Sequence, residues 1–433
     1  MVHTAIIADD LTGANDTAIQ FAKHGMRTFV RWDFPRGRKA PDFADVIVVD
    51  TETRAVSPRE AYERVREAAS NLQSLGVGRI YKKMDSTLRG NVGAEIRAVA
   101  DAIRPDIAVI APAFPRYGRT TVGGHQYVDG RPVSETEAAR DPRSPVSQSF
   151  IPALLREEAD TQVGLIAAET VAAGRSAIRE AIHFSLARGE KWIVFDAASE
   201  EDLRKIAAAA SDYKNVLWVG STGLAGVLPE ILAWPPAARA GGMPGRTGTV
   251  FVVAGSVSAT VRGQIEALLE HSVVPVVSVD PGRALRSPGT EILACVARGL
   301  ECLNTNPSAI LIASVAEPGK RDSGLTEGAR LGISGPEAGA RIASILGAIA
   351  AAIAADGCAG MVLTGGDTAI EVCRALEADS LEVLEEVAPG IPLCELSGTR
   401  TGPIRVVTKA GGFGDRDALI KAVRVLGGKE RSG

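Results

Sequence analysis

Charged and hydroxyl side chains follow four short apolar runs in the first half of the sequence. If these runs are parallel strands, their carboxyl ends meet at one edge of a sheet, where open parallel sheets bind ligands. Aspartates there can accept hydrogen bonds from sugar hydroxyls, and Arg54, Lys82 and Lys83 can hold a carboxylate. The pattern predicts a site for a polyhydroxy acid. The four segments are Asp9–Ala14, Asp50–Arg54, Lys82–Asn91 and Pro112–Thr120.

Each of these loops alone also has a simpler explanation. Asp10 and Thr12 are residue types that cap helices, and a helix could begin near Gly13. Capping explains the aspartates, but it does not explain two adjacent lysines, Lys82 and Lys83. Four such loops in succession therefore favour a ligand site over separate helix caps.

Glycine and hydroxyl residues with little charge follow the apolar runs of the second half. Glycine lets the backbone approach a ligand closely, and N–H groups at a helix N-terminus form an anion site. One glycine pair is more often a tight turn, but several at one sheet edge predict a phosphate-bearing ligand. The candidates are Ser256, Ser258, Thr364, Gly365, Gly366, Asp367, Thr368, Lys409, Gly411 and Gly412.

Two common nucleotide motifs are absent from the sequence. There is no G-x-x-x-x-G-K-[ST] segment and no G-x-G-x-x-G segment after the first apolar run. This speaks against a P-loop NTPase and a typical dinucleotide dehydrogenase. A sugar-acid dehydrogenase and a non-catalytic sensor of the acid stay open as alternatives. A sensor would usually carry an output domain such as a helix-turn-helix, and no such segment is found.

Six segments together resemble the four-carbon acid sugar kinase family, long known only as a domain of unknown function. They lie in order along the chain from residue 4 to about 420. They read IADDLTGANDTA at 7–18, KKMDSTLRGN at 82–91, the stretch Phe114–Asp141 with Asp141-Pro142, AGSVSATV at 254–261, LTGGDTA at 363–369 and TKAGGFG at 408–414.

The resemblance implies a sugar-acid domain followed by a nucleotide domain, in which ATP phosphorylates a terminal hydroxyl. Members of the family act on D-threonate, D-erythronate or 3-oxo-tetronates. The segment Pro132–Pro145 is more similar to the threonate and erythronate members, so D-threonate is the first expectation. By position, Asp10, Arg54 and Lys82–Asp85 resemble the substrate contacts. Ser256, Thr364–Asp367 and Gly411 resemble the ATP contacts.

The expected reaction is in-line attack of the terminal hydroxyl on the γ-phosphorus of ATP, in which positioning and charge stabilisation dominate. Mg²⁺ is expected with the nucleotide, since it neutralises phosphate oxygens and needs only one or two carboxylates. Asp367 is the candidate metal ligand. The candidate catalytic carboxylates are Asp10 and Asp85. The predicted substrate-binding residues are Asp9, Asp10, Arg54, Lys82, Lys83, Met84 and Asp85.

Short apolar runs alternate with helical patterns along the whole chain, such as Pro58–Leu75 and Asn91–Ile103. This rhythm predicts an α/β fold with mostly parallel sheets flanked by helices. The predicted strands are Thr4–Ala8, Val46–Val49, Arg79–Tyr81, Ile107–Ala111, Trp192–Phe195, Val216–Val219, Thr249–Ala254, Val274–Val279, Ala309–Ala313, Met361–Leu363, Leu393–Leu396 and Arg405–Val407.

A break in this rhythm predicts two domains. The segment Trp234–Gly248, WPPAARAGGMPGRTG, has adjacent prolines, four glycines and no periodicity, which is typical of a linker. The prediction is a sugar-acid-binding domain at 1–234 and a nucleotide-binding domain at 249–433. The active site is expected in the cleft between them.

Composition sets the remaining expectations. With a net charge of −4 and no long basic run, nothing suggests nucleic acid or a membrane surface as a partner. The chain starts almost at once with an apolar strand instead of a leader, and the apolar stretch Ile342–Ala355 is too short to cross a bilayer. The expected partners are a sugar acid and ATP in the cytoplasm, and a homo-oligomer stays open. Five cysteines, expected to be reduced and buried, are Cys295, Cys302, Cys358, Cys373 and Cys394.

Overall fold

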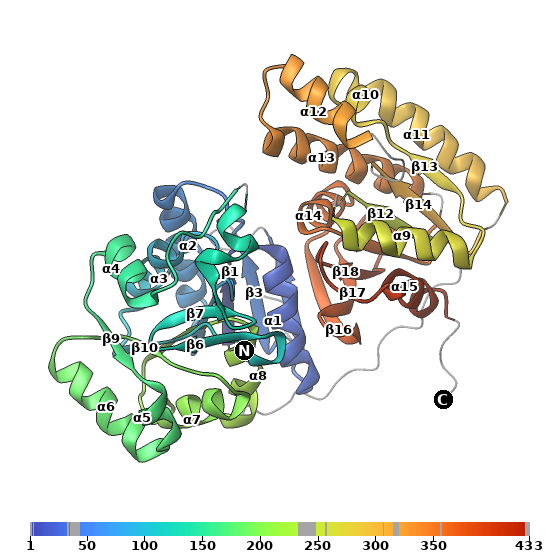
Figure 1. Cartoon of the computed structure of the whole chain (residues 1–433). Helices are drawn as coiled ribbons and strands as arrows, with labels where there is room; N and C mark the ends of the chain where they lie inside the picture. The colour runs from blue at the N-terminus through green and yellow to red at the C-terminus, as the bar shows by residue number, and fades with distance from the viewer. Residues whose placement is uncertain are drawn as a thin grey trace. The chain divides into compact units, whose positions relative to one another are not determined.

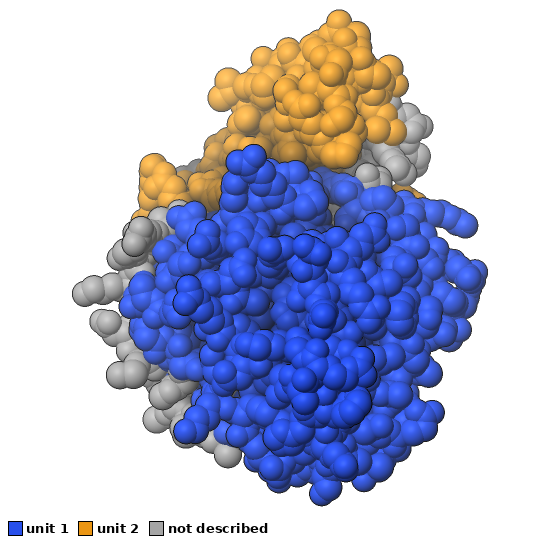
Figure 2. Space-filling view, turned by 90° about the vertical axis from the view of Figure 1, so that its left-hand side faces the viewer, with its two compact units in different colours: residues 1–239 blue, residues 240–433 orange. Residues whose placement is uncertain are grey.

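The computed structural model describes residues 2, 4–32, 34, 44–141, 143–232, 248–255, 258–305, 307–314, 320–355 and 357–428. The chain divides into two compact units, residues 1–239 and 240–433, which Figure 2 shows in blue and orange. The predicted linker, Trp234–Gly248, lies outside the described residues apart from Gly248. The exact domain boundaries and the interdomain cleft stay predictions, and each unit is described by itself.

The described part of the first unit contains a sheet of parallel strands in the order β2-β3-β1-β4-β11-β5-β10-β9. Strands β1, β3 and β5 are buried along their whole length, as expected when helices cover both faces of a parallel sheet. The strands are β1 (Thr4–Ala8), β2 (Thr28–Arg31), β3 (Val46–Asp50), β4 (Arg79–Lys83), β5 (Ile107–Ala111), β9 (Val163–Ile166), β10 (Trp192–Phe195) and β11 (Val216–Gly220).

Helices cover this sheet in two groups (Figure 1). Helices α2, α3 and α4 contact one another in sequence, and their apolar faces share a core with β1 and β3 that includes Ile7, Val49 and Val65. Helices α1, α8, α7 and α6 form the second series of contacts. The helices are α1 (Leu11–Lys23), α2 (Pro58–Ser74), α3 (Val92–Ile103), α4 (Ile151–Ala159), α5 (Ala168–Ala172), α6 (Arg175–Ala187), α7 (Glu200–Ala210) and α8 (Thr222–Ile231).

A small antiparallel sheet follows β5 and is tied to the main sheet by polar contacts. The Asp196 carboxylate accepts hydrogen bonds from the N–H groups of Gly123 and Gly124 at 2.7 and 2.8 Å. Gln126 donates to the carbonyl oxygen of Ser86 at 2.7 Å, which anchors the small sheet beside the loop after β4. The strands of the small sheet are β6 (Arg119–Val122), β7 (His125–Val128) and β8 (Arg131–Pro132). Three short 3-10 helices flank it: η1 (Pro115–Tyr117), η2 (Val133–Glu135) and η3 (Glu137–Arg140).

The second unit contains a mixed sheet in the order β13-β14-β12-β15-β18-β17-β16. Strands β13, β14, β12, β15 and β18 are parallel to one another. Strand β17 runs antiparallel to its two neighbours, β18 and β16. The predicted α/β class with mostly parallel sheets is therefore confirmed. The strands are β12 (Val250–Ala254), β13 (Val276–Ser278), β14 (Ala309–Ala313), β15 (Gly360–Thr364), β16 (Ser380–Ala388), β17 (Ile391–Ser397) and β18 (Ile404–Lys409).

All but the last residue of the apolar stretch Ile342–Ala355 lie in α13, which packs closely on α14. A β-carbon added to Gly347 of α13 would lie 2.6 Å from the carbonyl oxygen of Glu371 in α14. The stretch was expected to be too short to cross a bilayer, but α13 as a whole is, by length and composition, the one described helix that could do so. Half of its most apolar 18 residues are buried inside the fold. The helices of this unit are α9 (Ala259–His271), α10 (Pro281–Arg286), α11 (Pro288–Leu303), α12 (Lys320–Arg330), α13 (Gly335–Ala354), α14 (Gly366–Ala375) and α15 (Ala418–Leu426).

The cysteines agree with a reduced protein. All five are free thiols, and four of them are buried. Cys302 differs from the expectation, because its side chain is only half-buried on α11.

Candidate active site

The strand register of the first unit brings the predicted acid-binding segments together. Ala8 of β1 pairs with Asp50 of β3, and Ile7 pairs with Lys82 of β4. The loops that follow these strands are also joined, because the N–H of Thr53 donates to the carbonyl oxygen of Asp9 at 3.0 Å. The predicted residues after β1, β3 and β4 therefore lie at one edge of the sheet.

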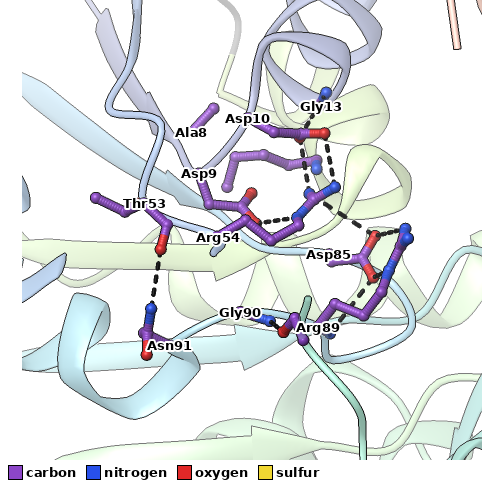
Figure 3. A network of polar contacts seen from close by, with 12 residues as sticks. Ala8, Asp9, Asp10, Gly13, Thr53, Arg54, Asp85, Arg89, Gly90 and Asn91 are labelled. Carbon is purple, nitrogen blue, oxygen red and sulfur yellow. Dashed lines mark hydrogen bonds and ion pairs between the residues drawn. The ribbon is translucent and has the colours of Figure 1, made fainter. Parts of the chain in front are cut away.

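Arg54 lies at the centre of this edge (Figure 3). Its Nε donates to Oδ2 of Asp9 at 2.7 Å, and its two terminal nitrogens donate to the two carboxylate oxygens of Asp10 at 2.6 and 2.7 Å. Nη2 of Arg54 also lies 3.9 Å from Oδ1 of Asp85. One guanidinium thus gathers three predicted carboxylates, and it keeps N–H donors for a ligand because it carries five in total.

Arg89 fixes Asp85 from a second direction. Its Nε donates to Oδ2 of Asp85 at 2.8 Å, and its Nη1 lies 3.3 Å from Oδ2 of Asp141. The hydroxyl of Thr87 donates to the same oxygen of Asp85. Arg89 and Asp141 are not among the predicted site residues, although both lie in the motifs that carry the family resemblance. The sequence signal that could have identified Arg89 is its place four residues after Asp85 in the same short segment.

Lys82 is a buried structural cation. Its Nζ lies 2.7 Å from Oε2 of Glu95 on α3, and it donates to the carbonyl oxygens of Lys83 and Ile7 at 2.7 and 3.3 Å. An ammonium group has three N–H donors, so these contacts leave none for a ligand. The ammonium group of Lys82 therefore has no donor left for the acid, and only the backbone of Lys82 could contact it.

Lys83 has the opposite character, although it is the next residue. It is buried, with 4% of its surface exposed. Among the described residues, no acceptor lies within hydrogen-bonding distance of its ammonium group. The Nζ atom lies beside the first turn of α1, where a β-carbon added to Gly13 would be 2.5 Å away. Lys83 is therefore the cation of the pair that is available to an anionic ligand.

Met84 is placed in the hydrophobic core. Its side chain packs with the residues between the sheet and α2, α3 and α4. Its N–H donates to the carbonyl oxygen of Gly220 on β11 at 2.9 Å. The side chain of Met84 thus belongs to the hydrophobic core, and it does not join the polar cluster of Asp9, Asp10, Arg54 and Asp85.

The two candidate catalytic carboxylates differ in their proton affinity. The pKa of Asp10 is raised, because burial outweighs the opposing charge of Arg54 and the neighbouring Asp9 raises it further. Burial also acts to raise the pKa of Asp85, but the charges of Arg54 and Arg89 together hold that pKa far below its usual value. Asp85 is therefore ionised at neutral pH, and Asp10 is the one that takes up a proton more readily.

The register of the second unit brings its predicted loops together in the same way. Ala254 of β12 pairs with Thr364 of β15, and Thr364 pairs with Lys409 of β18. Gly365 caps α14 with a φ of 100°, a conformation that favours glycine, and its N–H donates to the carbonyl oxygen of Lys409 at 2.9 Å. The ends of three adjacent strands thus carry a hydroxyl, a glycine turn into a helix, and a lysine.

Lys409 is a buried cation without a charged partner in the part of the chain that the structure describes. Its Nζ donates to the carbonyl oxygen of Ala410 at 2.9 Å and lies 3.4 Å from the hydroxyl of Thr364. Burial lowers the pKa of Lys409 to about 8, and no described carboxylate opposes this effect. A phosphate group is a ligand that would satisfy this charge.

The remaining predicted residues of this unit are placed as follows. Ser258 caps α9 and donates its hydroxyl to the carbonyl oxygen of Gly411 at 2.7 Å. Thr368 is buried, and a β-carbon added to Gly255 would lie 2.3 Å from its hydroxyl oxygen. Ser256 lies outside the described residues.

Asp367 is an exposed carboxylate in the first turn of α14. The described residues contain no group of three or more histidine, cysteine, aspartate or glutamate side chains that could hold a metal ion by itself. This donor set fits Mg²⁺ only as a nucleotide-bound ion, which usually takes one or two carboxylates together with phosphate oxygens and waters.

Models of two protein domains match the chain and together cover most of it. A sugar-binding N-terminal domain matches residues 4–228, and a nucleotide-binding C-terminal domain matches residues 251–419. The carboxylate cluster lies in the first match, and the glycine loops after β12, β15 and β18 lie in the second.

Curated relatives match nearly the full length. A D-threonate kinase from Salmonella typhimurium is 37% identical over 96% of this chain and 97% of its own. A D-erythronate kinase from Heliobacterium modesticaldum is 34% identical over 98% and 97%. A 3-oxo-tetronate kinase from Pseudomonas fluorescens is 30% identical over 98% and 96%. A solved structure of a Salmonella typhimurium protein has a TM-score of 0.84 at 27% identity and covers 98% of this chain and 100% of its own.

Proposed function

Because this chain belongs to the family of four-carbon acid sugar kinases, with its sugar-binding and nucleotide-binding domains, we propose that it phosphorylates the terminal hydroxyl of such an acid with ATP. The near full-length match to a D-threonate kinase carries this proposal and makes D-threonate the first candidate substrate. D-erythronate and 3-oxo-tetronates are the alternatives, because kinases of these acids are only slightly less similar.

The acid is proposed to bind over the edge of β1, β3 and β4. Lys83 supplies an ammonium group with no hydrogen-bond acceptor among the described residues, and Arg54 supplies the N–H donors that its aspartates leave free. These cations suit the carboxylate of the acid. The carboxylates of Asp9, Asp10 and Asp85 are acceptors for its hydroxyl groups. This mixed arrangement supports a sugar acid over a neutral sugar.

Phosphoryl transfer forms a bond between the terminal oxygen of the acid and the γ-phosphorus, and it breaks the bond between that phosphorus and ADP. The hydroxyl proton is proposed to pass to Asp10, whose pKa is raised. Asp85, held ionised by Arg54 and Arg89, would orient the hydroxyl.

A comparison of Asp10→Asn with Asp85→Asn tests these roles. Only Asp10→Asn should remove the acidic limb of the pH profile of kcat, and retention of that limb would transfer the role of base away from Asp10.

The nucleotide is proposed to lie over the ends of β12, β15 and β18. The candidate phosphate contacts are the hydroxyl of Thr364, the helix start at Gly365 and Gly366, and the loop at Gly411 and Gly412, with Lys409 as the cation. The single donor of the Ser258 hydroxyl is taken by the carbonyl oxygen of Gly411, so Ser258 would act by holding this loop. Asp367 would hold Mg²⁺ that arrives with ATP, and the ion would neutralise phosphate oxygens.

The proposed enzyme works in the cytoplasm on a small acid and ATP, without nucleic acid or a membrane as a partner. Its five free cysteines suit a reducing compartment. An ADP-release assay against D-threonate, D-erythronate and 3-oxo-tetronates, with NAD(P)H absorbance followed in parallel, tests the function. Turnover of one acid with ADP release is expected. Binding of the acid without ADP release would support a sensor, and a change in NAD(P)H absorbance would support a dehydrogenase.

A further inference from the structure

Ser258, which caps α9, and Gln264 within that helix hold the loop that follows β18 by its carbonyl groups. The hydroxyl of Ser258 donates to the carbonyl oxygen of Gly411 at 2.7 Å. Further along the helix, Gln264 is 1% exposed and directs its amide nitrogen at the same loop. Nε2 of Gln264 lies 3.0, 3.1 and 2.8 Å from the carbonyl oxygens of Phe413, Gly414 and Asp415, so its two N–H groups are shared among three acceptors.

These contacts determine where the N–H groups of the loop point. In a planar trans peptide, the carbonyl and the N–H of the next residue point in opposite directions, and the described chain has no cis peptide. The N–H of Gly412 shares a peptide with the carbonyl of Gly411, and the N–H of Gly414 shares one with the carbonyl of Phe413. Both N–H groups therefore point away from α9.

Gly412 and Gly414 are both exposed, although only Gly412 has open space on the side of its α-carbon where a β-carbon would stand. Within the described part of the chain, neither the Gly412 nor the Gly414 N–H donates to a protein acceptor. A β-carbon added to Gly412 would meet no atom within 4 Å. Lys409, the buried cation at the end of β18, precedes the loop by one residue. Free N–H groups next to a buried cation form a surface that suits a phosphate.

We propose that Gln264 is a positioning residue for the nucleotide. By holding three carbonyl groups of the loop, its amide fixes the N–H groups of Gly412 and Gly414 in the direction in which they donate to a phosphate. Gln264 itself does not touch the nucleotide. The inference rests on the proposed function, because it assumes that this loop binds ATP.

Two variants separate hydrogen bonding from packing. Gln264→Leu removes the donor and replaces it with an apolar side chain that is one atom shorter. Gln264→Glu keeps the shape but presents carboxylate oxygens to carbonyl oxygens. Asn71→Leu is the matched control, because Asn71 is a buried amide of the first unit that donates to the carbonyl oxygen of Phe34 at 3.1 Å. For each protein, ADP affinity is measured by calorimetry, KM is measured for ATP and for the acid, and Tm is recorded.

Both Gln264 variants are expected to lose at least about 10-fold in ADP affinity, which corresponds to about 1.4 kcal/mol, and to raise the KM for ATP with little change in the KM for the acid. Asn71→Leu should lower Tm, but it should not raise the KM for ATP relative to the KM for the acid.

Wild-type ADP affinity in Gln264→Leu would overturn the inference, provided that the wild type binds ADP. If the wild type binds no ADP, the proposed function fails first. If the Gln264 variants do not fold, Ser258→Ala removes one carbonyl contact and should give a smaller loss of the same kind, whereas unchanged affinity would again contradict the inference.

Discussion

The ammonium group of Lys83 occupies the space in which any residue other than glycine at position 13 would carry its β-carbon. The two atoms would be 2.5 Å apart, and the same β-carbon would lie 2.7 Å from Oδ1 of Asp10. Gly13 is a helical residue of α1, and its φ is not in the left-handed region. Glycine is therefore needed at this position for the approach of Lys83, and the backbone conformation does not require it.

Gly13→Ala should separate binding from stability. The added methyl group displaces the flexible end of Lys83 and disturbs Asp10, so the KM for the acid should rise by about 10-fold, the loss of one charge-assisted contact of about 1.5 kcal/mol. Thermal unfolding should show no large loss of stability, because alanine is favoured over glycine in a helix by about 0.5–1 kcal/mol. An unchanged KM for the acid would show that the position of Lys83 does not matter for binding.

Replacing each of the adjacent lysines by methionine should affect different properties of the protein, stability for Lys82 and acid binding for Lys83. Lys82→Met leaves the buried carboxylate of Glu95 without its cation, and breaking such a pair typically costs about 3–5 kcal/mol of stability. Lys83→Met removes an ammonium group that has no hydrogen-bond acceptor among the described residues and acts on Asp9, Asp10 and Asp85 only through its charge. Tm should therefore fall less than in Lys82→Met, while the KM for the acid rises. Chemical denaturation and steady-state kinetics on both variants check this. Equal stability losses would contradict the assignment of Lys82 to the protein and Lys83 to the ligand.

Strand geometry explains why sequence alone could not distinguish these lysines. Successive side chains of a strand point to opposite faces of the sheet, so Lys82 reaches Glu95 on α3 whereas Lys83 reaches the first turn of α1. The sequence predicts that both follow an apolar run, but the face that each one takes depends on which helices cover the sheet.

Fully buried strands were easier to predict than half-exposed ones. The apolar runs Thr4–Ala8 and Ile107–Ala111 match β1 and β5 residue for residue. Strand β16 (Ser380–Ala388), SLEVLEEVA, was not predicted, because its glutamates interrupt the apolar pattern of a strand that is antiparallel and partly exposed. Strand β2 (Thr28–Arg31), TFVR, is an exception, because it is buried along its length and was still not predicted. Its polar Thr28 and charged Arg31 leave an apolar run of only two residues.

Arg54→Ala should raise the KM for the acid far more than the KM for ATP. The substitution removes a donor to the acid and leaves Asp9 and Asp10 as neighbouring negative charges that repel its carboxylate. Loss of a charge-assisted contact predicts roughly 1.5–3 kcal/mol, or about 10- to 150-fold. Arg59→Ala is the control, because the side chain of Arg59 on α2 is 89% exposed. If the acid KM stays at the wild-type value in Arg54→Ala, Arg54 has no part in acid binding.

Gly412→Val tests whether the loop after β18 binds the nucleotide, and it should do so without lowering the stability of the protein. A β-carbon at this position meets nothing within 4 Å, so the variant should keep the wild-type Tm. The added side chain would stand beside the Gly412 N–H, where the phosphates are proposed to lie, so ATP affinity should fall by at least about 10-fold. Calorimetry with a non-hydrolysable ATP analogue measures this. Wild-type affinity would place the phosphates elsewhere.

Lys409 should link nucleotide binding to the uptake of a proton. Its pKa is lowered to about 8 by burial, so the free protein has lost most of this proton by pH 9. A bound phosphate favours the ammonium form and raises the pKa, so binding draws a proton from the solvent above pH 8, and affinity falls as pH rises further. The unfolded chain keeps the ordinary lysine pKa of 10.5. Between about pH 8 and 10.5 it therefore binds more protons at this residue, and the contribution of Lys409 to the free energy of unfolding rises with pH.

Calorimetry with ADP at pH 9, in two buffers with different ionisation enthalpies, measures the proton uptake directly. The apparent binding enthalpy should differ between the buffers for the wild type and for Lys191→Met, a control at an exposed lysine of the first unit. Lys409→Met should show no such difference and should bind ADP more weakly at pH 7, where the wild-type lysine is charged. Buffer-independent enthalpies in the wild type would mean that Lys409 keeps its protonation state on binding, and the lysine would then not be the cation that faces the phosphates.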